Sequence, residues 1–112
     1  MTQLVACRIA AGALPHLVAL RLVHLEYIAA YRDRILFGGP IRDAEGRPEA
    51  MVIVLRDTDA AQAQAFIAAE PYNASGKVFA EVTIRPWSQV LPEAEPGALA
   101  AAIADERARV GQ

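Results

Sequence analysis

The sequence lacks the features that mark several common classes of protein. Its 112 residues include one cysteine, Cys7, so an internal disulfide is impossible and a reducing, cytoplasmic setting is expected. No apolar run approaches the roughly 20 residues that span a bilayer, and residues 1–10 lack the basic leader of a signal peptide. A net charge of −2 offers no basic surface to a nucleic acid, and aromatic residues make up only 6% of the chain.

Metal centres and nucleotide sites also find little support. Two histidines, one cysteine and scattered acids show no metal-ligand spacing. Gly38-Gly39-Pro40 follows an expected strand, but it opens no helix and lacks the G-x-G-x-x-G spacing of a phosphate loop. We therefore predict no metal ion, no cofactor, and no membrane or nucleic-acid partner.

The composition is that of one globular domain, with 54% hydrophobic and 21% charged residues. Apolar residues alternate with a period of two in some segments and with a helical period in others. Four strands and two helices are expected. The first half of the chain is expected to form a strand over 4–10, a helix from Pro15 to about 32–34, and a strand over 35–37 that is stopped by Gly38-Gly39-Pro40. A strand over 51–55 follows, and then a helix between the N-cap candidates Asp57-Thr58-Asp59 and Pro71. The last strand is expected over 77–86.

This order is the ferredoxin-like βαββαβ pattern, an α+β fold in which two helices cover one face of a four-stranded sheet. The last strand has one apolar side and one mixed side, the latter carrying Phe79, Glu81, Thr83 and Arg85. The mixed side is too polar for a dry core and too apolar for solvent, so we expect it to face a second copy in a homodimer. Residues 91–112 are expected to form a linker and an added C-terminal helix outside the 1–90 domain.

Two ionisable residues occupy the apolar stripes of the predicted helices. His24 follows Leu17 and Arg21 on the first stripe, and Glu70 shares a face with Phe66 on the second. Burying an ionisable group is costly unless the group is paired or neutralised. The two positions therefore predict one shared pocket, in which His24 and Glu70 form a hydrogen bond directly or through one water.

Several short motifs, taken in their order along the chain, carry a family resemblance: Arg21-x-x-His24-Leu25, Gly39-Pro40, Glu70-Pro71-Tyr72, Gly76 and Pro86-Trp87. Over about residues 3–90 the chain resembles the YciI-like, or YCII-related, family of small dimeric α+β proteins. The resemblance implies a ferredoxin-like fold of the dimeric α+β barrel type, sheets packed face to face in a dimer, and a His–acid active site. The family's tripeptide normally begins with Asp, so Glu70 keeps the carboxylate and adds one methylene of reach. Some relatives act on lactone or muconate-type compounds, removing halide or shifting protons.

Two functions remain open from the sequence. In the first, the protein is a small lyase, isomerase or dehalogenase-type enzyme acting on a lactone-like or carboxylate-bearing metabolite. His24 and Glu70 would be its catalytic acid–base pair, and Arg21, Tyr72 and Ser75 would bind the substrate. In the second, it is a non-catalytic dimeric module that binds a small molecule or another protein.

Each candidate residue also has a purely structural interpretation. His24 could be a core histidine bonded to a backbone carbonyl, and Arg21 could form an ion pair with Glu81 or Glu70. Ser75 fits loop capping better than ligand binding. His16 is expected on the surface, and Cys7 is expected to be a buried structural thiol.

Overall fold

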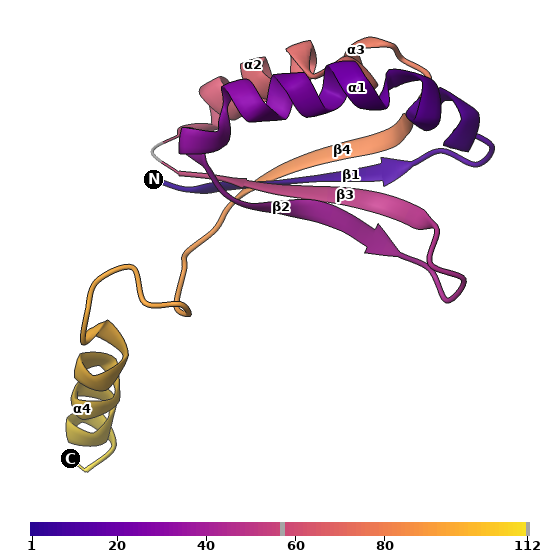
Figure 1. Ribbon diagram of the computed structural model, residues 1–112. Coiled ribbons are helices and arrows are strands. Elements are labelled where there is room, and N and C mark those ends of the chain that lie inside the picture. The colour runs from indigo at the N-terminus through magenta and orange to yellow at the C-terminus, as the bar shows by residue number, and fades with distance from the viewer. Residues whose placement is uncertain (57, 112) are drawn as a thin grey trace.

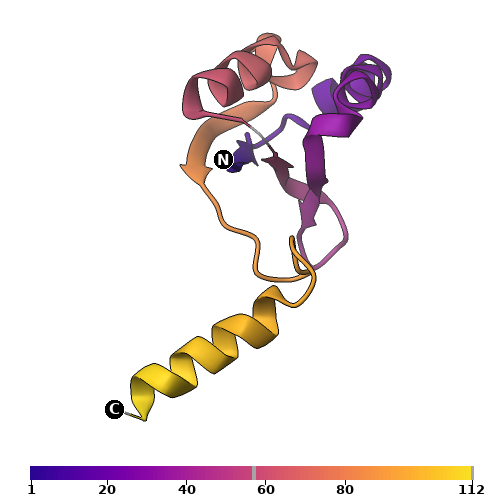
Figure 2. The same ribbon diagram turned by 90° about the vertical axis from the view of Figure 1, so that its left-hand side faces the viewer.

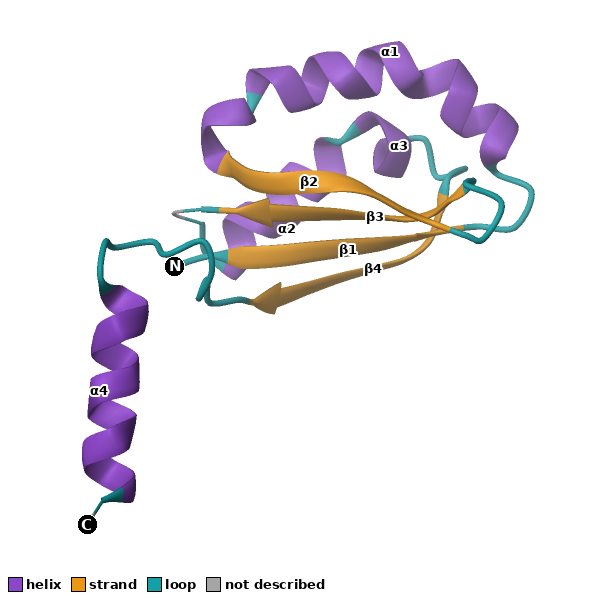
Figure 3. Cartoon of the chain, turned by 60° about the horizontal axis from the view of Figure 1, so that its bottom comes forward, coloured by secondary structure: helices purple, strands orange, loops and turns teal. Residues whose placement is uncertain are grey.

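One antiparallel sheet of four strands forms the base of the structure, a computed structural model that describes residues 1–56 and 58–111. The strands are β1 (Gln3–Ile9), β2 (Ile35–Arg42), β3 (Pro48–Leu55) and β4 (Phe79–Pro86). Their order across the sheet is β2-β3-β1-β4, so β1 and β3 are central (Figure 3). The internal place of β3 confirms the expectation from its continuous apolar run.

Three helices lie together on one face of this sheet (Figure 1). They are α1 (Leu14–Ala30), α2 (Ala60–Ala69) and the short α3 (Pro71–Ala74), and a 3₁₀ turn, η1 (Arg32–Arg34), leads from α1 into β2. The strand and helix order and the antiparallel pairing confirm the predicted ferredoxin-like α+β fold.

The core lies between the helices and the central strands. Alternate residues of β1 and β3 point toward the helices and are buried, among them Val5 and Ile53. They pack against the buried face of α2, which contributes Ala63, Phe66 and Ile67. Each large apolar side chain removed from water in this way stabilises the fold by about 1.5–3 kcal/mol.

Local sequence signals set both ends of α2. The Asp59 side chain accepts from the Gln62 N–H at 2.7 Å, and the Gln62 side chain accepts from the Asp59 N–H at 2.9 Å, which forms the predicted capping box. Asp57, another predicted cap candidate, lies outside the described residues. At the other end Glu70 adopts an extended backbone before Pro71, so α2 stops there and α3 begins. The Glu70 side chain is thereby held between two helices.

The prediction that the second strand stops at Gly38-Gly39-Pro40 was wrong. β2 continues through these residues to Arg42, pairing with β3 along its length. As an edge strand, β2 can include a proline because only one side of the strand is hydrogen bonded. The extension makes Arg42 part of β2, together with Gly38 and Pro40, which face the helices.

The prediction that Phe79 shares a sheet face with Glu81 was also wrong. The pairing of β1 with β4 shifts between Arg8 and Ile9, so Ala80 is an extra residue opposite that step. Such a bulge reverses the alternation of the strand beyond it. Phe79 therefore packs on the helix side against the core, while Glu81 pairs with Arg8 at 3.6 Å on the open side.

The last helix, α4 (Ala98–Val110), stands apart from the sheet and its helices (Figures 1 and 2). It begins after Gly97, whose φ of 83° is the left-handed conformation that glycine adopts readily. None of its residues is buried within the described chain. Among the described helices, none has the length and apolar character needed to cross a membrane.

Candidate active site

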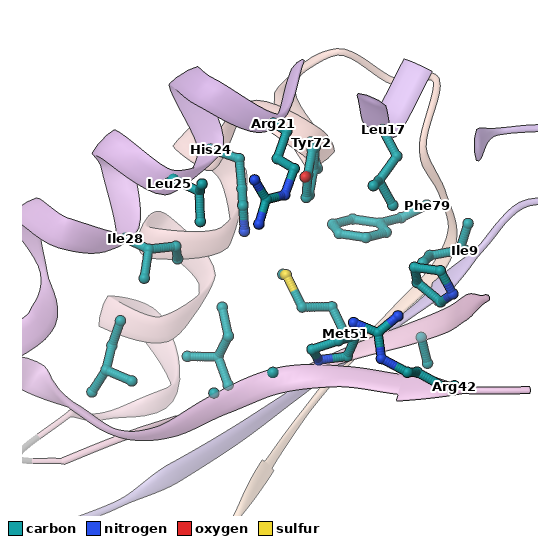
Figure 4. A pocket seen from close by; sticks show the side chains of 17 residues that line it. Ile9, Leu17, Arg21, His24, Leu25, Ile28, Arg42, Met51, Tyr72 and Phe79 are labelled. Atoms are coloured by element: carbon teal, nitrogen blue, oxygen red, sulfur yellow. The ribbon is translucent and has the colours of Figure 1, made fainter. Parts of the chain in front are cut away.

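A cavity of about 340 Å³ opens between α1 and the sheet (Figure 4). Most of the residues that line it are apolar, including Ile28 from α1, Met51 from β3 and Phe79 from β4. The predicted apolar stripe of α1 forms one wall, from Leu17 through His24. The volume lies within the range of small-molecule sites, about 300–1,000 Å³.

The structure brings His24 and Glu70 together at this cavity. Nδ1 of His24 lies 2.5 Å from Oε1 of Glu70, although 46 positions separate the two residues in the chain. The Glu70 side chain is fully buried, and that of His24 is 13% exposed. The contact agrees with the predicted hydrogen bond. In the alternative interpretation His24 would bond to a backbone carbonyl, whereas here its Nδ1 is bonded to the Glu70 carboxylate. Its catalytic role remains a prediction.

Both carboxylate oxygens of Glu70 accept hydrogen bonds. Oε1 faces His24, and Oε2 accepts from the Asn73 N–H at 3.3 Å in the first turn of α3. An ionised carboxylate can only accept, so Nδ1 of His24 carries a proton in this arrangement. In the neutral imidazole, Nε2 then has a free lone pair. His24 thus presents a proton acceptor at the cavity.

Tyr72 stacks on the imidazole of His24. Their ring centroids are 4.0 Å apart and their planes differ by 12°, while Phe79 meets Tyr72 edge-on at 6.1 Å. Burial raises the pKa of the Tyr72 hydroxyl, and the negative charge of Glu70 adds to that effect, whereas Arg21 opposes it. Tyr72 therefore remains a neutral hydrogen-bond donor at physiological pH, and its ring fixes the plane of the imidazole.

Arg21 lines the cavity one turn of α1 before His24. Glu81 is paired with Arg8 and Glu70 with His24, so the two ion pairs considered for Arg21 are absent. Among the described residues Arg21 forms no ion pair at all. Its guanidinium is available to a ligand.

Ser75 does not line the cavity. Its hydroxyl donates to the Tyr72 carbonyl at 2.7 Å and accepts from the Lys77 N–H at 3.1 Å, which is the loop-capping role. His16 is exposed, and Cys7 is completely buried. Burial, with a smaller contribution from the charge of Glu70, raises the pKa of the Cys7 thiol to about 12.

Arg42 lines the cavity although sequence reasoning did not select it. Arg42 was not selected because the strand was expected to stop at Gly38-Gly39-Pro40, before it reaches Arg42. Had the strand been extended, its alternation would have placed Arg42 with Gly38 and Pro40 on the helix side. No cluster of three or more histidine, cysteine, aspartate or glutamate side chains in the described chain could hold a metal ion.

The fold is similar to that of solved structures of small enzymes and related proteins. One is 5-chloro-2-hydroxyhydroquinone dehydrochlorinase (TftG) from Burkholderia phenoliruptrix, in complex with 2,5-dihydroxybenzoquinone. It has 19% identity and a TM-score of 0.73, and the match covers 80% of this chain and 95% of TftG. Another is a putative antibiotic biosynthesis monooxygenase from Bacteriodes thetaiotaomicron, with 17% identity, a TM-score of 0.53, and coverage of 85% and 93%.

A third similar structure is a variant of SnoaB, a cofactor-independent oxygenase from Streptomyces nogalater. It has 13% identity and a TM-score of 0.50, with 82% of this chain and 96% of SnoaB covered. At these identities the likeness concerns the fold. No curated protein matches the sequence significantly. The family model for the YCII-related domain matches residues 1–88, which include every strand of the sheet and both members of the His24–Glu70 pair. The chain belongs to the YCII-related family.

Proposed function

We propose that this protein is an acid–base enzyme that acts on a lactone-like or carboxylate-bearing small molecule. The observation that carries the proposal is the buried Glu70 carboxylate bonded to Nδ1 of His24, beside an apolar cavity. A histidine held in one tautomer by a carboxylate has its other nitrogen ready to take and return a proton.

The reaction begins with a proton on a carbon next to a carbonyl group of the substrate. Nε2 of His24 takes this proton, and the electron pair of the broken C–H bond moves toward the carbonyl as an enolate. In an isomerisation, the imidazolium returns the proton at another atom. In an elimination, the electron pair instead expels a leaving group such as halide, and the imidazolium later releases its proton to water.

Neighbouring groups are suited to the charges that this reaction develops. Glu70 stabilises the imidazolium, because a carboxylate 2.5 Å away favours the positive ring. Arg21 can bind a carboxylate or a developing enolate oxygen, and the Tyr72 hydroxyl can donate to the same oxygen. The apolar walls lower the polarity around these interactions, which strengthens each of them.

The name of one structural neighbour agrees with this chemistry. TftG is described as a dehydrochlorinase and was solved with a quinone-type compound. Removal of HCl requires loss of a proton and of halide, which an acid–base residue can promote. At 19% identity this agreement supports the class of reaction proposed here and gives no specific substrate.

The proposal includes a homodimer formed through the open face of the sheet, in a cytoplasmic setting. Phe37 and Ile41 of β2 are 42% and 48% exposed, and Ile41 borders a hollow on that face with Arg8 and Glu81. Covering this mixture of apolar and charged side chains by a second copy would remove apolar surface from water. Residues 1–90 would be the catalytic unit, with 91–112 as an appendage.

The test uses γ-lactones that carry a carboxylate, incubated in D2O while NMR follows exchange of the C–H protons beside the carbonyl. The wild-type protein should catalyse exchange or full turnover. His24→Asn should lower the rate by about 10²–10⁴, the usual contribution of a general base. His16→Asn is the matched control, because His16 is exposed and lies outside the cavity. Binding without exchange, or equal rates in both variants, would leave a binding module instead.

A further inference from the structure

The cavity carries a second arginine on the wall opposite His24. Arg42 ends β2, and its side chain lines the cavity together with Met51 from the neighbouring strand (Figure 4). Arg21 reaches the cavity from α1. The two guanidinium groups thus come from different layers of the fold, with apolar side chains such as Phe79 between the layers.

The lining is basic in a protein that is acidic overall. Two of its residues, Arg21 and Arg42, carry a permanent positive charge, and no Asp or Glu is among the described residues that line it. The Glu70 carboxylate, which is bonded to His24, offsets one of these two charges. The chain as a whole has 13 acidic and 11 Lys or Arg residues. This local excess of positive charge favours an anionic ligand.

Arg42 lacks the partners that neighbouring arginines have. Arg47, on the same hairpin, lies 3.4 Å from Asp43 and 3.5 Å from Glu45. Arg42 donates to the Gly46 carbonyl at 2.8 Å, and it forms no ion pair with any residue of the described chain. One hydrogen bond leaves most of the five N–H donors of the guanidinium for a ligand.

We infer that the cavity binds a dianion, with one anionic group at Arg21 and a second at Arg42. An apolar chain or ring joining the two groups would lie against Met51 and Phe79. Carboxylates suit this arrangement, because a guanidinium binds them through two parallel hydrogen bonds. The inference rests on the proposed active site and narrows its substrate class from a carboxylate-bearing molecule to one with two acidic groups.

Adipate and hexanoate form a matched pair of probes, since they share a carbon chain and differ in the second carboxylate. Isothermal titration calorimetry should show adipate binding at least ~10-fold more tightly than hexanoate at low salt, equivalent to ~1.4 kcal/mol. Because Arg42 is exposed, salt should weaken this preference by screening. Equal affinities, or no binding of adipate at millimolar concentration, would overturn the inference.

Substitutions test which residue causes the preference for adipate over hexanoate. Arg42→Gln should remove the advantage of adipate and leave the affinity for hexanoate unchanged, whereas Arg21→Gln should weaken both ligands. Arg47→Gln is the control, because Arg47 lies on the same hairpin and does not line the cavity. A loss of the adipate preference in Arg47→Gln as well, or an equal loss for both ligands in Arg42→Gln, would mean that Arg42 only supports the hairpin through Gly46.

This experiment is independent of catalysis. His24→Asn can abolish exchange without changing the preference for adipate, because the preference depends on Arg42. If the wild type prefers adipate and exchanges no substrate proton, the dianion site stands and the proposed reaction falls. If exchange depends on His24 and adipate shows no advantage, the reaction stands and the dianion site falls.

Discussion

Replacing Glu70 by glutamine removes a buried charge and keeps the shape of the side chain. In the native protein both oxygens accept, from the His24 ring and from the Asn73 N–H. An amide has one accepting and one donating end. The Asn73 N–H can only donate, so the amide oxygen must face Asn73 and the NH2 group must face His24.

With the amide in this orientation, the His24 ring must adopt the other tautomer. Nδ1 of His24 must accept from the amide, so the single proton of the neutral ring moves to Nε2, which then has no lone pair for the substrate. We expect proton exchange to fall by about 10²–10⁴. Glu70→Gln also weakens two hydrogen bonds of the folded protein. A hydrogen bond to a charged acceptor contributes about 1.5–3 kcal/mol, and a neutral one contributes about 0.5–1.5 kcal/mol. Glu70→Gln should therefore lower the free energy of unfolding by about 2 kcal/mol.

Urea unfolding followed by the fluorescence of Trp87 measures this change, provided that the denaturant dependence is the same in each variant. Glu70→Ala is the comparison, because it leaves both N–H donors unpaired and creates a cavity. It should cost about 4 kcal/mol or more. Equal unfolding midpoints for wild type and Glu70→Ala would refute the paired arrangement. A Glu70→Gln variant as unstable as Glu70→Ala would refute the change of tautomer that lets His24 accept from the amide.

Two other properties can be measured without a substrate. Because the pKa of Cys7 is raised to about 12, its contribution to stability is fully present below the pKa of the unfolded thiol, about 8.5, and is lost as pH rises from there toward 12. Native protein should resist iodoacetamide at mildly alkaline pH, and Cys7→Ala should flatten the alkaline loss of stability; rapid native alkylation would contradict the burial. Light scattering should give twice the chain mass of 12.0 kDa at micromolar concentration, and Ile41→Arg should favour the monomer. A mass of 12.0 kDa for the wild type at all concentrations would rule out the dimer.

Periodicity and caps predicted most of the fold and the pairing of His24 with Glu70. The stripe of α1 and the Glu70-Pro71 helix end are local signals, and both act within a few residues of the chain. An ionisable residue on each stripe, together with the family resemblance, predicted that the two would meet. The geometry also accommodates the longer glutamate, since its carboxylate reaches the ring at 2.5 Å.

The misplaced residues depend on the neighbouring strand. Phe79 changed faces because a bulge opposite Ile9 inserts Ala80, and single-strand alternation contains no sign of a bulge. Arg42 was overlooked because Gly38-Gly39-Pro40 reads as a stop, while an edge position in the sheet tolerates it. Both residues line the cavity, so these pairing details decide which side chains meet a ligand.

The proton on the His24 ring is the most direct measure of the proposed acid–base centre. Long-range proton–nitrogen NMR distinguishes the two tautomers, and a His16→Gln background leaves His24 as the only histidine. In the neutral ring, we expect the proton on Nδ1 in the otherwise wild-type protein and on Nε2 after Glu70→Gln. A proton on Nε2 in both proteins would contradict the role of Glu70 in preparing His24 as a base.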